Sequence, residues 1–184
     1  GIHNYANLKK HFMMYDEAVT LYNKALKEDS KNNVIRYNLA TTLQGQGKYE
    51  EAKIEILKIL EINPKFIIAH KTLSELMDYN SDDLHISSMV NLSNEKGIEE
   101  IQKVDLYFAL AKANEDIKKY SDSFNYLKKA NEIKRKNMNF NVKSELDVFD
   151  DIIKIFKKID FKKKKEHISN FKNIIFICGM PRSG

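Results

Sequence analysis

An internal repeat with a period of 34 residues constrains the fold more than any other feature of the sequence. Shifting the chain by 34 places aligns residues 15–18, Tyr-Asp-Glu-Ala, with residues 49–52, Tyr-Glu-Glu-Ala. The same shift aligns residues 25–26 with 59–60 and residues 29–30 with 63–64. A unit of this length is a pair of helices that cannot bury its apolar face alone, so neighbouring units must stack. We therefore expect an all-α helix-turn-helix solenoid.

The clearest copy of the repeat resembles the tetratricopeptide repeat (TPR) family. It carries Tyr37-Asn38-Leu39-Ala40, then Gly47-Lys48-Tyr49-Glu50-Glu51-Ala52, then Ile59-Leu60 and Asn63-Pro64. The small side chains of Ala40 and Ala52 would let its two helices pack closely. Gly47 would allow the turn between the helices, and Pro64 would end the second one.

The other copies are less regular, and residues 1–135 are predicted to hold about four repeats. The first copy is partial, because residues 5–8 stand where a first helix should end. The third, from Phe66 to about Lys96, is degenerate and has Ile86 at a small-residue position. The fourth runs from Leu106 to Arg135. We expect eight or so stacked helices. Four tyrosines at repeat packing positions are predicted to be core residues: Tyr15, Tyr22, Tyr49 and Tyr120.

A long amphipathic helix is predicted after the repeats, because apolar residues recur at helical spacing between Asn141 and Ile159. We assign residues 136–172 to amphipathic capping and linker helices that cover the last face of the solenoid. A partner-binding or dimerising helix is the alternative.

Basic charge is concentrated in the C-terminal part of the chain. Residues 136–184 carry 11 basic and 6 acidic side chains, which accounts for the whole formal charge of +5. The run Lys162-Lys163-Lys164-Lys165 is either a solvated helix face or an electropositive approach to an anionic nucleotide.

The TPR resemblance implies a protein or peptide partner, bound along the concave face that the first helices form. Candidate groove residues are Asn7, Tyr37, Asn38, Thr41, Lys71, Glu75, Phe108 and Lys112. They are mixed in character, and a generic solvated surface is the alternative. A chaperone carboxylate clamp is not expected, because the positions that are cationic in that subset hold His3, Ile68 and Thr72.

The last eleven residues read as a buried β-strand that leads into a phosphate-binding loop. Five apolar residues, 174–178, precede Gly179, and residues 179–184 fit the pattern G-x-x-x-x-G. Backbone N–H groups of such a loop converge on phosphate oxygens. Because a lone strand has nothing to pair with, we assign residues 173–184 to the first strand and loop start of an α/β domain that lies mostly beyond Gly184.

The interior of this loop resembles the 5′-phosphosulfate loop of sulfotransferases. The matching residues are Pro181-Arg182-Ser183-Gly184. Bacterial TPR–sulfotransferase fusion proteins have similar segments upstream, like those at residues 85–89, 108–113 and 130–135 here. The resemblance implies that the intact protein uses 3′-phosphoadenosine 5′-phosphosulfate (PAPS) to sulfate a hydroxyl or amine of an unspecified acceptor.

In that reading Arg182 and Ser183 meet the 5′-phosphate, and the cofactor-binding set is Gly179, Pro181, Arg182, Ser183 and Gly184. The catalytic base and the 3′-phosphate contacts lie downstream in the family. Residues 1–184 alone are therefore expected to hold no catalytic residue, to bind no cofactor and to be inactive.

Two alternatives stay open: a TPR peptide-binding scaffold without enzymatic activity, and TPR repeats fused to a P-loop NTPase.

The five histidines show no metal-ligand spacing, and His85 beside Asp82 and Asp83 is interpreted as a helix-start cluster. No run approaches the roughly 18 apolar residues of a membrane span. With the aromatics assigned to the core, no nucleic-acid partner is expected. The single Cys178 fits a reducing, cytoplasmic compartment.

Overall fold

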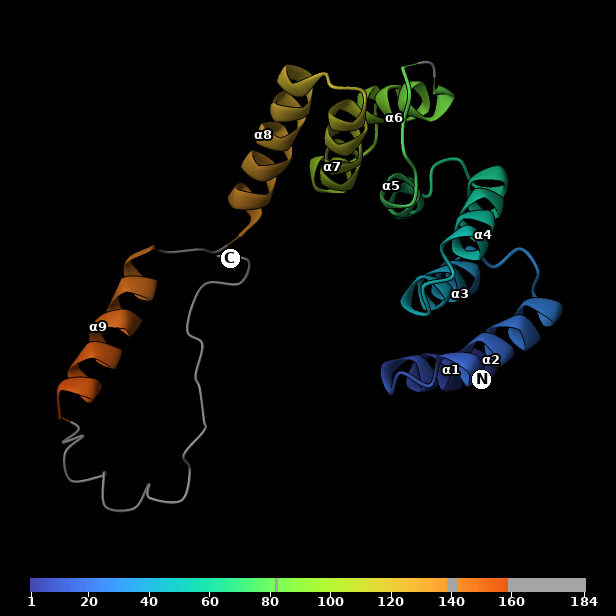
Figure 1. Cartoon of the computed structure of the whole chain (residues 1–184), viewed down its shortest axis with the longest axis horizontal. Coiled ribbons are helices and arrows are strands. Elements are labelled where there is room, and N and C mark those ends of the chain that lie inside the picture. The colour runs from blue at the N-terminus through green and yellow to red at the C-terminus, as the bar shows by residue number, and fades with distance from the viewer. Residues whose placement is uncertain (82, 139–141, 159–184) are drawn as a thin grey trace. The chain divides into compact units, whose positions relative to one another are not determined.

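The computed structural model describes residues 1–81, 83–138 and 142–158, and every regular element in these ranges is an α-helix. The chain divides into two compact units, residues 1–138 and 139–184. The first unit holds the eight helices α1 to α8, which alternate as the first and second helices of four repeats (Figure 1). Their bounds are α1 Ile2–His11, α2 Tyr15–Glu28, α3 Asn33–Gly45, α4 Tyr49–Ile62, α5 Ile67–Glu75, α6 Leu84–Asn94, α7 Glu100–Asp116 and α8 Tyr120–Asn137. The predicted all-α repeat architecture and its eight helices are confirmed.

Local sequence signals explain where several of these helices begin. The Asn32 side chain accepts a hydrogen bond from the backbone N–H of Ile35 at 3.1 Å and caps α3. Asp83 caps α6 by accepting from the N–H of His85 at 2.8 Å, so the helix-start interpretation of this cluster is confirmed for His85 and Asp83. Glu99 opens α7 in a capping box.

The turns between paired helices use the same backbone conformation in three repeats. Met13, Gly47 and Lys118 occupy equivalent positions and have φ angles of 59°, 76° and 63°. Only glycine adopts this left-handed region without a steric cost. The prediction that Gly47 allows the turn is confirmed, and Met13 and Lys118 make the same turn with a side chain attached.

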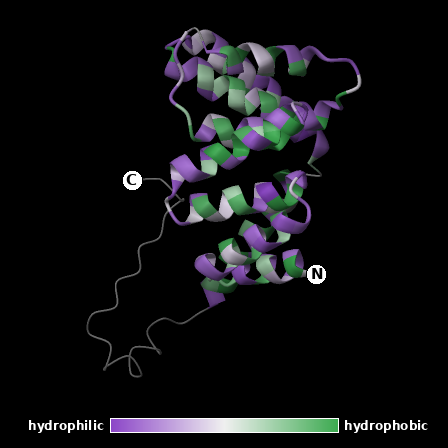
Figure 2. Cartoon of the chain, turned by 90° about the vertical axis from the view of Figure 1, so that its right-hand side faces the viewer, coloured by the Kyte–Doolittle hydropathy of each residue, from purple (hydrophilic) through white to green (hydrophobic). Residues whose placement is uncertain are grey.

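Small residues let paired helices approach, as predicted. Ala40 and Ala52 are fully buried, as is Ala18 at the position equivalent to Ala52. The buried core runs through the unit as three clusters, centred on α1–α3, on α3–α5 and on α6–α7. Figure 2 shows both hydrophobic and hydrophilic residues along the helices, as expected where each helix buries one face.

The prediction that four repeat tyrosines are core residues is wrong for two of them. Tyr22 is fully buried and Tyr15 is half-buried, but Tyr49 is 58% exposed and Tyr120 is 64% exposed. Tyr15 packs beside Gly45, the last residue of α3, which is the first helix of the next repeat. Tyr49 has no such neighbour because α5 ends early, at Glu75. Asp, Asn and Ser residues, which favour turns, dominate 78–83.

Tyr120 lies on the second helix of the last repeat in its unit. No further first helix follows within the described part of that unit, residues 1–81 and 83–138. Its ring therefore has no following repeat to pack against.

Helix α9, Val142–Lys158, belongs to the second unit. It confirms the predicted amphipathic helix. Its apolar side chains are exposed: Val142, Leu146, Val148, Phe149, Ile152, Ile153, Ile155 and Phe156. Its capping role stays a prediction. The predicted strand and phosphate loop at 173–184, and the lysine run 162–165, lie outside the described residues.

Candidate functional site

Hydrogen bonds and an ion pair connect the first helix of each repeat to the first helix of the next, and we call this series the ladder. The Asn38 amide on α3 donates to Asn7 Oδ1 on α1 at 3.2 Å. One repeat further, the hydroxyls of Tyr37 on α3 and Thr72 on α5 lie 3.2 Å apart. Lys71 on α5 and Asp105 on α7 form an ion pair of 3.1 Å. We call this surface of α1, α3, α5 and α7 the first-helix face, and it contains most of the predicted groove residues.

The start of the ladder is organised around two asparagines. Asn7 Oδ1 accepts from the Tyr22 hydroxyl at 2.6 Å as well as from Asn38. The Asn38 amide also lies 2.9 Å from His3 Nε2. These bonds fix the Asn7 carboxamide by its oxygen. Among the described residues its NH₂ group has no acceptor, so two N–H donors remain available.

Lys10 lies one turn beyond Asn7 on the same helix. Its ammonium group donates to the Thr41 hydroxyl at 2.5 Å. Burial lowers the pKa of Lys10, because the charged form is partly withdrawn from water. No carboxylate pairs with it among the described residues. A hollow of about 350 Å³ is lined by Asn7, Lys10, His11 and Asn38.

The next cation along the face is already neutralised. Burial by itself lowers the pKa of Lys71, but the hydrogen bond and charge of Asp105, with Glu75 and Tyr37 in minor roles, raise it overall. Glu75 itself is exposed at the last residue of α5. An incoming anion would gain less at Lys71 than at Lys10, because Asp105 is already there.

Two predicted groove residues are used differently. The Lys112 ammonium donates to the Met77 carbonyl and to Asp116, and it lies 5.3 Å from the Tyr79 ring centroid. It therefore braces the segment that follows α5. Phe108 is half-buried, with Lys134 Nζ 6.0 Å from its ring centroid.

The structure thus brings together Asn7, Asn38 and Thr41 with Lys10. It places Tyr37 with Thr72, and Lys71 with Asp105. Sequence reasoning missed Lys10. The available signal was its spacing, because residues three apart on a helix share a face.

The stacked helix pairs and the ladder between their first helices define a protein-interaction module of repeat type. Residues 14–85 and residues 104–137 each match the tetratricopeptide repeat family. The chain belongs to this family and is a TPR protein.

Curated relatives match at moderate identity. The chain is 29% identical over 168 residues to a protein of Aquifex aeolicus (strain VF5) described as uncharacterized. The matched region covers 91% of this chain and 22% of that protein. It is 36% identical over 62 residues to the TPR repeat-containing thioredoxin TTL4 of Arabidopsis thaliana, covering 34% of this chain and 9% of that protein. The chain thus spans about a fifth or less of the length of these relatives.

Solved structures of MamA are similar in fold. The RS-1 ArsTM double mutant matches with a TM-score of 0.57 at 17% identity, covering 76% of each chain. An AMB-1 structure matches with a TM-score of 0.54 at 20% identity, covering 79% of this chain and 76% of that one. These similarities concern the fold alone.

Two further properties bear on function. In the described ranges, no three His, Cys, Asp or Glu side chains gather in a way that could hold a metal ion. None of the described helices combines the length and apolar character needed to cross a bilayer.

Proposed function

We propose that residues 1–138 bind an acidic peptide along the first-helix face, with an anionic group at Lys10. TPR modules bind proteins or peptides, and the observation that supports this particular ligand is the state of Lys10. Its ammonium group is partly desolvated and has only the neutral Thr41 hydroxyl as partner. A counter-charge brought by a ligand would offset that desolvation.

The neighbouring Asn7 supplies the geometry for such a ligand. Its carboxamide is held by Tyr22 and Asn38 through the oxygen, which leaves the two amide hydrogens for an acceptor. A carboxylate in the hollow could accept from both Asn7 and Lys10. Hydrogen bonds to charged groups contribute about 1.5–3 kcal/mol each, so the pair would select acidic over neutral peptides.

The test uses the full chain and an array of ten-residue peptides that differ in the number of acidic residues. We expect binding to rise with acidic content, and Lys10→Met to weaken the best peptide at least tenfold while circular dichroism stays unchanged. Lys24→Met, an exposed lysine on α2, is the matched control and should bind like the wild type. Acidic and neutral peptides of equal affinity, or an unaffected Lys10→Met variant, would contradict the proposal.

We further propose that the intact protein is a cytoplasmic, PAPS-dependent sulfotransferase of the bacterial TPR-fusion type. Support comes from the sequence alone: the loop 179–184, which contains Pro181-Arg182-Ser183-Gly184, directly follows the apolar run 174–178 of strand type. In this proposal Gly179 and these four residues bind the 5′-phosphosulfate, and residues 136–172 link the repeats to the catalytic domain. A non-enzymatic TPR scaffold is equally compatible with the described fold, and a P-loop NTPase fusion is the third alternative.

This second proposal is tested on the intact protein. Arg182→Ala should reduce PAPS affinity or turnover at least tenfold, which corresponds to about 1.4 kcal/mol. Arg135→Ala, an exposed arginine of the repeats, should have no such effect. Near-normal PAPS binding and turnover by Arg182→Ala would exclude the assigned role, and ATP hydrolysis without PAPS binding would favour the NTPase alternative.

A further inference from the structure

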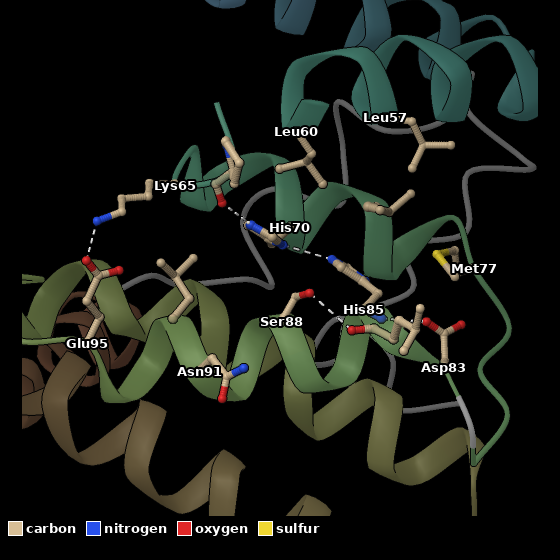
Figure 3. A pocket seen from close by; sticks show the side chains of 14 residues that line it. Leu57, Leu60, Lys65, His70, Met77, Asp83, His85, Ser88, Asn91 and Glu95 are labelled. Carbon is tan, nitrogen blue, oxygen red and sulfur yellow. Dashed lines mark hydrogen bonds and ion pairs between the residues drawn. The ribbon is translucent and has the colours of Figure 1, made fainter. Parts of the chain in front are cut away.

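A hollow of about 730 Å³ lies between α4, α5 and α6 (Figure 3). Apolar atoms make up most of the surface that faces it, and half of its fourteen lining residues are apolar: Leu57, Leu60, Pro64, Leu73, Met77, Leu84 and Leu92. The polar lining residues are Lys65, His70, Asp83, His85, Ser88, Asn91 and Glu95. This size and mainly apolar composition are those of small-molecule sites.

The degenerate third repeat explains why the hollow exists. In the second repeat Ala52 is fully buried, and α3 and α4 pack directly on each other. The equivalent position in the third repeat holds Ile86, which is half-buried and packs into the cluster of α6 and α7. Helix α6 therefore packs on α7, while α5 packs on α4 and α7. The space between α5 and α6 is left open.

A chain of hydrogen bonds replaces the missing helix contact. The Pro64 carbonyl can only accept, so His70 Nε2–H donates to it at 2.7 Å. His70 Nδ1 then accepts from His85 Nε2–H at 2.9 Å, and His85 Nδ1 accepts from the Tyr79 hydroxyl at 2.7 Å. Every imidazole nitrogen is used, and both rings are neutral in this arrangement. The wall that they form is polar but uncharged.

Residues that flank α5 and α6 lie at both ends of the hollow. At one end Lys65, which precedes α5, forms an ion pair with Glu95, which follows α6. At the other end lie Met77 and Asp83, from the segment that joins the two helices (Figure 3). Asp83 is also committed to capping α6. A through-running peptide or helix needs open ends, so the shape suits a compact molecule.

The charged groups around the hollow are already paired, which also favours a neutral ligand. The Lys65–Glu95 pair neutralises itself, and the Asp83 carboxylate faces the N-terminus of α6. A charged ligand would lose hydration against the neutral histidine wall without gaining a free counter-charge. Ser88 and Asn91 on α6 offer polar atoms at the edge, where one hydrogen-bonding group of a ligand can be held.

We infer that this hollow is a binding site for a compact, uncharged and mainly apolar small molecule. The site is independent of peptide binding at Lys10, because the two hollows share no residue. A suitable probe is N-phenylnaphthylamine, an uncharged fluorophore with one N–H group.

The experiment follows methionine methyl signals of the full chain by NMR, because Met77 lines the hollow and Met14 does not. Titration with N-phenylnaphthylamine should shift the Met77 signal saturably and leave Met14 unchanged. Ser88→Phe places a ring in the hollow and should weaken the Met77 response at least tenfold. The adjacent exposed serine supplies the control: Ser87→Phe should bind within twofold of the wild type.

Other results would overturn the inference. One is a wild-type chain whose Met77 signal does not move up to the solubility limit of the probe. Another is a folded Ser88→Phe variant that binds like the wild type; Asn91→Trp serves the same purpose if Ser88→Phe does not fold. A third is an anionic analogue, anilinonaphthalene sulfonate, that shifts Met77 with equal affinity, since the site is assigned to uncharged ligands.

Discussion

The imidazole rings of His70 and His85 are nearly parallel, with their planes 10° apart and Nδ1 of His70 2.9 Å from Nε2 of His85. Burial lowers the pKa of both rings. For His85 the neighbouring His70 lowers it further, the charge of Asp83 opposes this, and the resulting pKa is about 4. The folded protein therefore favours the neutral form of both rings, and protonation of the pair costs stability.

Stability should decline with acidification through this pair. The folded pKa of His85, about 4, lies below the ordinary value of 6.5, so the unfolded chain binds the proton first as pH falls. The stabilisation is complete above pH 6.5 and is lost as pH falls from 6.5 towards 4. Allowing for its partial exposure, we expect a loss of about 2 kcal/mol in the free energy of unfolding.

Urea unfolding of the wild type and of His85→Gln, from pH 7 to pH 4, measures this loss. Glutamine can donate at one end and accept at the other without titrating, so the wild type should lose its advantage over the variant as the pH falls. His11→Gln, at an exposed histidine, should follow the wild type in parallel. The charged groups nearest the hydrogen-bonded histidines are unchanged in these variants. They are Asp83, Asp116, Lys112 and the Lys65–Glu95 pair. Parallel wild-type and His85→Gln curves would show that the pair is not the sensor.

The left-handed turns predict opposite effects for two substitutions. Lys118→Gly should stabilise the protein by about 1 kcal/mol, because glycine relieves the steric cost at a φ of 63°. Gly47→Ala should destabilise it by a similar amount. No atom lies within 4 Å of an added Cβ at Gly47, so the loss is a backbone effect. Thermal unfolding measures both changes. Lys119→Gly, whose φ is −87°, should bring no gain, and a gain equal to that of Lys118→Gly would reject the strain explanation.

Enlarging Ala52 should overpack the core. Its side chain is fully buried where α4 meets α3 and the first core cluster. Ala52→Leu is expected to lower the free energy of unfolding by about 1–3 kcal/mol, measured by urea titration. Glu61→Leu adds the same side chain at an exposed site on α4 and should change stability by less than about 0.5 kcal/mol. Equal effects of the two changes would argue against close packing at Ala52.

Lys112 is predicted to be a structural brace. Lys112→Met removes its bonds to the Met77 carbonyl and Asp116, and its contact with Tyr79. We expect a loss of about 1–2 kcal/mol. The Tyr79 N–H, which donates to Asp116 Oδ2 at 3.1 Å, should then exchange faster with solvent. Native-state hydrogen exchange measures this rate. Lys128→Met, an exposed lysine on α8, is the control, and unchanged Tyr79 protection in Lys112→Met would contradict the brace.

Much of the fold could be predicted from the sequence because the signals that define each repeat are local. The spacing of Ala40, Ala52 and Gly47 specifies a close helix pair and its turn, whatever lies around it. The helix-start role of Asp83 is equally local. Such signals act within about one repeat, where residues three or four apart share a helix face.

The candidate site was predictable only in part. Asn7 and Asn38 occupy consensus positions of the repeat, and they do meet on the first-helix face. Lys112 was assigned to the groove by its register, but it turns towards the segment after α5. Lys10 is not among the predicted groove residues, and its lack of a carboxylate partner among the described residues can be recognised only when its surroundings are known.

The sequence by itself determined the all-helical TPR architecture, its period and its close-packed pairs, because these depend on short-range spacing. Only the tertiary structure decided which equivalent residues are buried and which are exposed. Tyr15 is covered because α3 reaches Gly45, whereas Tyr49 is exposed because α5 ends at Glu75. The contact of His70 with His85, 15 residues apart, depends on how α6 packs on α7. Burial and long-range contacts belong to the assembled repeats, and no single repeat encodes them.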